Sequence, residues 1–327
     1  MFSVFFLKKG IDSIDSIDGM RYNRATKIRK RGIKMKVLSL FDGISCGMVA
    51  LERAGILVER YVAYEIDKYA IKISKKNYPQ IEHCGDVTTA DFTQYKGFDF
   101  VIGGSPCQNM STLGDRKGLK GEKSKLFYEF ARAIKEAQPR YFLLENNANM
   151  PKADRKEITD ILGVEPIEIN SSLFVPQNRK RLYWIGKRKI DGTYEKVEIL
   201  VTNQRTKTLK DIMCDKHEFI ELVPFVKKKI PALIEKYGYL PKMFNPYNVA
   251  EIKEVAPCLT TQNSQTRSNT VIVRKDDKYF MLNSVEWERL QGLTENYTEG
   301  FSDNIRKSAI GNGWTVDVIA HIFKGLR

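Results

Sequence analysis

The chain reads Phe-Asp-Phe-Val-Ile-Gly-Gly-Ser-Pro-Cys-Gln from residue 98 to residue 108. Its apolar first half, residues 98–102, is typical of a buried parallel strand. Two glycines and Pro106 end this strand sharply and place a single thiol, that of Cys107, at its carboxyl end. Ligands bind at that edge of an open α/β sheet, so Cys107 is a candidate nucleophile. A cysteine that only fills a core is a small apolar side chain and does not need a loop of glycine and proline.

Strand and helix patterns alternate on both sides of this stretch. The further strands that we expect lie at residues 37–41, 61–64, 141–144, 168–174 and 181–187, with a shorter element leading into 85–87. The expected helices lie at 48–54 and 126–137, with another that ends near Lys75. Such alternation predicts an α/β, Rossmann-like fold, in which helices cover both faces of a largely parallel sheet.

This alternation stops after Lys187 and returns near the carboxyl terminus. Residues 188–303 are rich in charge and show only short strand patterns, at 270–273 and 279–282, which predicts a smaller, irregular domain. The apolar tail, with its Gly-Asn-Gly turn, is expected to pack back onto the first domain. The predicted catalytic domain therefore comprises residues 35–187 plus 304–327.

Residues 1–34 read differently from the rest of the chain. They contain a repeated Ile-Asp-Ser followed by a basic run, without the periodicity of a helix or strand. This composition predicts a disordered extension, and Met35 directly before the first core strand suggests the functional start. An arm that binds nucleic acid is the alternative interpretation of the basic run.

Composition excludes several classes of protein. No apolar run approaches the roughly 20 residues that span a bilayer, and no signal peptide is evident, so we expect a soluble, cytoplasmic protein. Five scattered cysteines without a Cys-x-x-Cys pair, and three histidines, argue against a disulfide framework and a metal centre. The net charge is +14, of which residues 1–34 contribute nine basic minus three acidic residues, or +6. This excess is compatible with nucleic acid as a partner.

Three loops that follow successive strands suggest a cofactor site. The first, residues 41–47, is glycine-containing but lacks the G-x-G-x-x-G pattern of dinucleotide binding. Glu65 ends the second strand, where an acid commonly accepts hydrogen bonds from ribose hydroxyls, and Asp86 ends the third, where it can accept from an adenine amino group. Each carboxylate alone is explained equally well as a solvated side chain at the end of a strand. Together they favour an adenosine-bearing cofactor without a phosphate cradle, namely S-adenosyl-L-methionine.

Ordered motifs extend this pattern along the chain. They are Phe-Asp-Gly-Ile-Ser-Cys-Gly at 41–47, Tyr-Glu-Ile at 64–66, Gly-Asp-Val at 85–87, Gly-Gly-Ser-Pro-Cys-Gln at 103–108, Leu-Glu-Asn-Asn at 144–147, Gln-Asn-Arg-Lys-Arg at 177–181 and Gly-Asn-Gly-Trp at 311–314. On these motifs residues 36–327 resemble the DNA (cytosine-5)-methyltransferase family, most closely its animal de novo branch and the bacterial and phage relatives of that branch. The family usually has Glu-Asn-Val where this chain has Asn147 as the third residue.

The resemblance implies a role for each site residue. Cys107 is the nucleophile that adds to carbon 6 of cytosine, which makes carbon 5 able to attack a methyl group. Glu145 holds a proton near ring nitrogen 3, Arg181 binds the 2-oxo group, and Arg179 braces the Cys107 loop or a phosphate. The residues implied in cofactor binding are Phe41, Asp42, Gly43, Ile44, Glu65, Ile66, Asp86, Val87, Pro106, Asn312 and Trp314.

The implied partner is double-stranded DNA, from which the target cytosine is flipped out. Residues 109–125 are basic and glycine-containing and suggest a loop that closes over the flipped base. Residues 188–303 are then the target-recognition domain, with Lys187 to Lys189, Lys227 to Lys229 and residues 260–267 as candidate DNA contacts. Arg267, Gln262 and Asn263 are the candidates for reading base edges.

Two other functions are compatible with these motifs. A tRNA methyltransferase shares them but usually carries a Cys-Phe-Thr element that this chain lacks. A catalytically silent DNA-binding paralogue would be expected to have lost Cys107, Glu145 or the cofactor acids, and all are present. An active enzyme has three possible settings: a restriction-modification system, protection of phage DNA, or action on its own.

Overall fold

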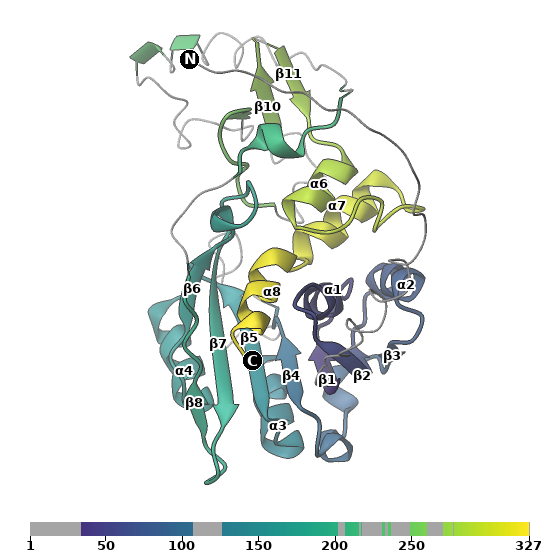
Figure 1. Cartoon of the computed structure of the whole chain (residues 1–327), viewed down its shortest axis with the longest axis vertical. Coiled ribbons are helices and arrows are strands. Elements are labelled where there is room, and N and C mark those ends of the chain that lie inside the picture. Colours follow the sequence, from purple (N-terminus) through teal and green to yellow (C-terminus); the bar gives the residue numbers. More distant parts are fainter. Residues whose placement is uncertain are drawn as a thin grey trace, which may run out of the picture. The chain divides into compact units, whose positions relative to one another are not determined.

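The centre of the protein is an eight-stranded sheet with the order β3-β2-β1-β4-β5-β7-β6, in which β8 pairs with β7 (Figure 1). A computed structural model describes residues 34–106, 126–201, 207–215, 217, 231–232, 235–236, 249–259, 271–276 and 278–326. Five neighbouring strands run parallel: β3 (Glu82–His83), β2 (Leu57–Tyr64), β1 (Lys34–Leu40), β4 (Phe100–Gly103) and β5 (Tyr141–Asn147). Their carboxyl ends therefore meet at one edge.

The other part of the sheet is antiparallel. The long strand β7 (Lys180–Arg188) runs against β5, and β6 (Ile167–Asn170) and β8 (Tyr194–Lys196) both run against β7. The register pairs Asn147 with Arg181 and Tyr141 with Lys187. The start of β7 consequently lies at the same edge as the end of β5.

Helices cover both faces, as the sequence predicts. The buried side chains of α1 (Cys46–Arg53), α2 (Lys68–Asn77) and α8 (Val316–Lys324) share one core with Val37 and Leu143 of the sheet. Those of α3 (Leu126–Ala137) and α4 (Lys152–Leu162) share a second core with Leu38 and Leu144. Successive residues of a strand thus enter opposite cores, which is the period of two that a strand buried on both faces requires. The α/β fold expected from the sequence is confirmed.

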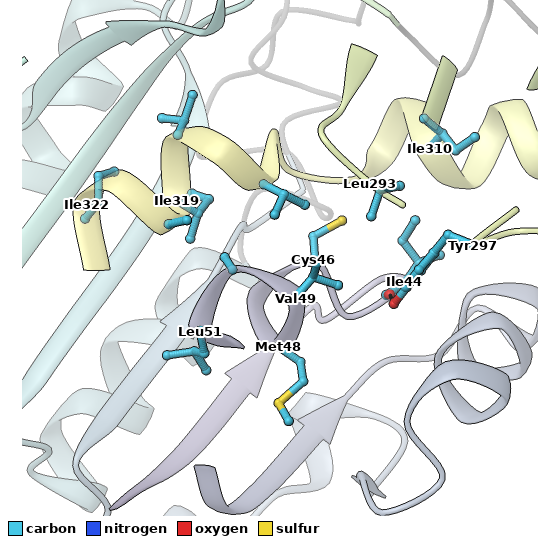
Figure 2. Packing of buried hydrophobic residues seen from close by; sticks show 14 of the residues in the cluster. Ile44, Cys46, Met48, Val49, Leu51, Leu293, Tyr297, Ile310, Ile319 and Ile322 are labelled. Atoms are coloured by element: carbon cyan, nitrogen blue, oxygen red, sulfur yellow. Dashed lines mark hydrogen bonds between the residues drawn. The ribbon is translucent and has the colours of Figure 1, made fainter. Parts of the chain in front are cut away.

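The carboxyl-terminal tail returns to the main sheet. In Figure 2, Ile319 and Ile322 of α8 lie over α1, which contributes Val49 and Leu51 to the same core. Leu293, Tyr297 and Ile310 extend this core past Ile44, and Tyr297 donates a hydrogen bond to the Ile44 carbonyl (2.6 Å). The tail is therefore packed against the helix that follows the first strand.

A smaller sheet lies in the region between the main sheet and the tail. It has the order β11-β10-β9, with β9 (Val249–Glu251), β10 (Ile272–Lys275) and β11 (Lys278–Met281), followed by α6 (Ser284–Leu290) and α7 (Asp303–Asn312). The remaining short 3-10 helices are η1 (Val87–Thr89), η2 (Phe92–Tyr95), η4 (Ser171–Leu173) and η5 (Leu209–Ile212). The main sheet itself continues to Lys196, beyond the domain boundary that we expected at Lys187.

No helix within the described parts of the chain has the length and apolar character needed to cross a membrane.

Candidate active site

Five loops converge at the carboxyl edge of the parallel strands. They follow β1, β2, β3, β4 and β5, and the chain changes direction across the sheet between β1 and β4. Ligands in open α/β sheets bind at such a switch point. Among the described residues, those that the sequence singles out in these five loops are therefore brought to one edge.

The loop after β1 is shaped by an inward-facing carboxylate. Asp42 accepts hydrogen bonds from the hydroxyls of Ser39 (2.6 Å), Tyr61 (2.7 Å) and Ser45. Burial raises the pKa of Asp42, although these hydroxyls oppose the rise. Gly43 has a φ of 59°, in the left-handed region that favours glycine. The carboxylate of Asp42 thus holds the loop, while the loop backbone is left to face a ligand.

Glu65 joins the first two loops. Its Oε2 accepts from the amide of Gly43 (2.8 Å), and its Oε1 accepts from the amides of Ile66 and Asp67 (both 2.8 Å). A carboxylate offers about four acceptor positions, so Oε2 retains one for a ligand hydroxyl. The neighbouring Ile66 is 74% exposed and offers an apolar surface beside the acid. This combination of acceptor and apolar surface fits a ribose and its base.

The third loop adds a second exposed acid. Oδ1 of Asp86 accepts from the backbone amide and the hydroxyl of Thr88 (both 2.9 Å), which fixes the start of η1. Val87 is buried beneath it. Asp86 itself is exposed, so its Oδ2 is available to an amino group of a ligand. The acids predicted from the sequence therefore stand at the ends of adjacent strands.

Trp314 forms a wall between the cofactor loops and the loop after β4. A Cβ atom added to Gly104 would lie 2.7 Å from the indole Nε1 and 3.1 Å from Oε2 of Glu145. A Cβ atom on Gly47 would lie 3.6 Å from the same ring. Because they lack a Cβ atom, both glycines allow this close approach of the indole. Asn312, two residues before Trp314, is exposed and is the last residue of α7.

We expect Gly104→Ala to lower the rate of a reaction that uses this candidate site by about 100-fold, because the new methyl group displaces Trp314 or Glu145 by a fraction of an ångström to an ångström. Steady-state kinetics at a matched fraction of folded protein measure the effect. The matched control is Gly186→Ala, whose Cβ would clash with the ring of Phe142 in the core. That variant is expected to lower stability but to leave the kcat of the folded fraction unchanged. Equal kcat losses in both variants would contradict this prediction.

Glu145 and Arg181 form an ion pair beside this wall. Nε of Arg181 lies 2.9 Å from Oε1 of Glu145, and the two side chains are only 14% and 12% exposed. The next residue on β5, Asn146, donates from Nδ2 to Oγ (3.1 Å) and the carbonyl (3.4 Å) of Ser105. This contact fixes the start of the loop after β4 beside the ion pair, one residue before Pro106.

The resemblance implies that Arg179 braces the Cys107 loop or a phosphate, and in the structure its guanidinium contacts main-chain carbonyls. The residue is 5% exposed, and its guanidinium donates to the carbonyls of Leu259 (2.8 Å), Gly313 (3.1 Å) and Gly311 (3.3 Å). It therefore ties the segment after β9 to the turn that carries Trp314. Arg179 and Arg181 are two residues apart, the spacing that places both side chains on one side of an extended chain, and both contact Sγ of Cys258.

Several predicted functional residues lie outside the described residues. They are Cys107 itself, the basic loop at 109–125, Lys227 to Lys229, and the polar stretch at 260–267 with Gln262, Asn263 and Arg267.

The structure argues against Lys187, Arg188 and Lys189 as DNA contacts. Since β7 is antiparallel to β5, Lys187 pairs with Tyr141 at the start of β5, six residues beyond Arg181. Six residues of strand span about 20 Å, so these three side chains lie at the opposite edge of the sheet. A charge count along the sequence does not reveal this, because the direction of β7 is a tertiary property.

Cys258 is a site residue that the sequence does not indicate. Its thiol lies against both arginines, yet 79 and 77 residues separate it from Arg179 and Arg181. Nothing in its local sequence signals the contact. Among the described residues, no cluster of His, Cys, Asp and Glu has the arrangement of a metal site.

Comparisons with known proteins show to which family the chain is similar. The family model "C-5 cytosine-specific DNA methylase" matches residues 35–327. An orphan methyltransferase of Bacillus phage rho11s is 33% identical over 222 residues, 62% of this chain and 44% of that protein. A type II methyltransferase of Lactococcus lactis subsp. cremoris is 29% identical over 308 residues, 89% of this chain and 77% of that protein. The chain thus spans less than half of the length of the phage relative.

Solved structures share the fold. The Entamoeba histolytica methyltransferase EhMeth superposes with a TM-score of 0.71 at 17% identity, covering 90% of this chain and 98% of that one. A putative DNA modification methyltransferase encoded within an Escherichia coli prophage gives a TM-score of 0.64 at 21% identity, covering 89% and 98%. At these identities the likeness shows the architecture.

Proposed function

Because the chain belongs to the C-5 cytosine-specific DNA methylase family, we propose that it methylates carbon 5 of cytosine in double-stranded DNA. Its cofactor in this proposal is S-adenosyl-L-methionine, which supplies an electrophilic methyl group when bound. The observation that carries the proposal is the Glu145–Arg181 ion pair, which lies beside the start of the loop in which Cys107 follows β4 in the sequence.

Cys107, Glu145 and Arg181 each have a separate role in the proposed reaction. The Cys107 thiolate adds to carbon 6 of the flipped cytosine, which gives carbon 5 the electron density of an enamine. Glu145 holds a proton at ring nitrogen 3 and so offsets the negative charge that the addition brings to the ring. Arg181 keeps the Glu145 carboxylate in place and donates to the 2-oxo group of the base. Loss of the carbon 5 proton to solvent and elimination of Cys107 complete the reaction.

The first three loops fit the proposed cofactor. Oε2 of Glu65 has an acceptor position left for a ribose hydroxyl, Ile66 offers an apolar surface to the adenine, and Asp86 is exposed to accept from its amino group. Trp314, between Gly47 and Gly104, closes the site on the side toward Glu145. The first loop lacks the glycine pattern that cradles a pyrophosphate, in keeping with a cofactor that has none.

The DNA duplex is the substrate in this proposal. Residues 188–303 recognise the DNA sequence, with the exception of β8, which belongs to the main sheet. The reacting atoms of cytosine lie inside the stacked duplex, so the base must be flipped out to reach Glu145. Methylation in the cytoplasm of a bacterial or phage-infected cell is the proposed setting, in a restriction-modification system or without one.

Bisulfite sequencing of duplex DNA incubated with the full chain and S-adenosyl-L-methionine tests the proposal. Protected cytosines that cluster in one short sequence motif are the expected result and also reveal the target. A reaction without the cofactor and a reaction with the Cys107→Ser variant are the controls, and neither should protect any cytosine. Transfer of labelled methyl groups to tRNA but not to duplex DNA would replace this proposal by the tRNA methyltransferase alternative. No transfer to either, by folded protein that binds the cofactor, would favour the silent paralogue.

A further inference from the structure

Cys258 lies in the segment that follows β9 and contacts both arginines of the site. Its Sγ is 3.5 Å from Nη1 of Arg179 and 3.8 Å from Nη2 of Arg181, and both nitrogens donate toward the sulfur. In the thiol form, Sγ also donates to the carbonyl of Leu259 (3.4 Å). A sulfur between two guanidinium groups is a much better acceptor as a thiolate than as a thiol.

The charges around this sulfur are unbalanced. Arg181 has a carboxylate partner in Glu145. Arg179 is nearly buried, and among the described residues its guanidinium contacts only main-chain carbonyls besides Cys258. The cluster of Arg179, Arg181, Glu145 and Cys258 therefore carries one net positive charge when Cys258 is a thiol and none when it is a thiolate.

The pKa values of the two cysteines in the site region shift in opposite directions. Burial raises the pKa of the Cys258 thiol, but attraction to the guanidinium groups of Arg179 and Arg181, with their hydrogen bonds, outweighs it and lowers the pKa below its usual value. Cys46 is buried too, and burial, with a smaller contribution from Asp42, raises its pKa to about 12, although Arg179 opposes the rise. The guanidinium groups therefore outweigh burial at Cys258 but not at Cys46.

We propose that Cys258 is a positioning residue of the active site, in which its thiolate bridges Arg179 and Arg181 and thereby holds Arg181 against Glu145. The proton of the thiol passes to solvent when the bridge forms. The effect on methylation rests on the proposed function, whereas the bridge itself does not. Since the thiolate is present only above the thiol's pKa, the bridge is lost as the pH falls through that value.

The bridge is tested first without catalysis. Ultraviolet absorbance of thiolates is followed against pH in the full-length Cys107→Ser protein and in the same protein with Cys258→Ala added. Their difference gives the titration of Cys258, and the corresponding difference for Cys84→Ala, an exposed cysteine, gives a reference. We expect the Cys258 midpoint at a lower pH than the Cys84 midpoint. A Cys258 midpoint at or above that of Cys84 would overturn the proposal.

The consequence for catalysis is tested with Cys258→Ser, which keeps a hydroxyl but does not ionise in this range. We expect kcat for methyl transfer to fall about tenfold above the thiol's midpoint, with the KM for S-adenosyl-L-methionine unchanged. Below the midpoint the variant and the wild type should converge, because the wild type has lost its thiolate. A ratio of the two rates that does not depend on pH would mean a packing role only and would overturn the proposal.

Cys214→Ser is the matched control for this substitution. Cys214 is also a partly buried free cysteine, its backbone amide donates to Glu286, and its thiol is not placed in the active site. That variant should keep the wild-type rate at every pH. If the wild-type protein transfers no methyl group to any DNA, the proposed function fails, while the absorbance titration still decides whether Cys258 forms the bridge.

Discussion

Replacing Cys107 with serine is expected to abolish methyl transfer to DNA, by roughly 10⁴-fold or more, without weakening the binding of S-adenosyl-L-methionine. A serine hydroxyl does not ionise near neutral pH and is a far poorer nucleophile than a thiolate. The proposed cofactor residues Glu65 and Asp86 belong to other loops and are held by their own backbone contacts, so the substitution leaves them in place. Methyl transfer and calorimetric binding of the cofactor measure the two effects separately.

A duplex that carries 5-fluorocytosine at the target position distinguishes the role of Cys107 from a general loss of activity. Fluorine in place of the carbon 5 hydrogen blocks the final elimination, so the wild type should stay covalently attached to this DNA on a denaturing gel. The Cys107→Ser protein should not, although it still binds the cofactor. Near-normal turnover or a covalent adduct in the serine variant would show that another residue is the nucleophile.

The parallel core of the fold could be predicted because its elements carry complete local patterns. The expected helix at 126–137 is α3 with the same bounds, and the apolar run at 98–102 contains most of β4. The helix α4 was not predicted from the sequence. Its buried residues are Asp154, Ile158 and Leu162, spaced four apart, so only two of the three buried positions are apolar. Too little of its face is apolar for the pattern to stand out.

In the candidate site too, some residues could be predicted from local motifs and others could not. The neighbourhood of Glu145 and Arg181 was implied by ordered motifs, and the pairing of β5 with β7 explains it, since both residues lie near the edge at which these strands meet. The roles of Arg179, Gly104 and Cys258 depend on contacts with residues far away in the sequence. Local spacing carries no information about such contacts, and only the folded arrangement reveals them.

Glu145→Gln is expected to lower kcat by about 10²- to 10⁴-fold while changing the KM for DNA much less. The amide has the shape of the carboxyl group and can still accept from Nε of Arg181, which lies 2.9 Å from Oε1 in the wild type. It cannot hold and release the proton at ring nitrogen 3, and a positioned acid or base contributes a factor of this size. Single-turnover methyl transfer at saturating cofactor measures the loss directly.

Glu168→Gln is the matched control for this substitution. Glu168 lies on β6 and pairs with Lys180 at 3.4 Å, but both side chains are about half exposed, at 47% and 58%. An exposed ion pair of this kind contributes about 0–1 kcal/mol, so the control should keep the wild-type rate. An activity of Glu145→Gln within threefold of the wild type would show that the carboxyl group does not take part in the chemistry.

The ion pair also predicts how the rate loss of Glu145→Gln combines with the rate loss of an Arg181 substitution. If Arg181 acts both on the base and by holding Glu145, the two residues work as a unit, and residues in direct contact give non-additive effects. The double variant Glu145→Gln with Arg181→Ala should then be only slightly slower than the slower single variant. Fully multiplicative losses would mean that the two side chains act independently, and that the contact between them serves the fold more than the reaction.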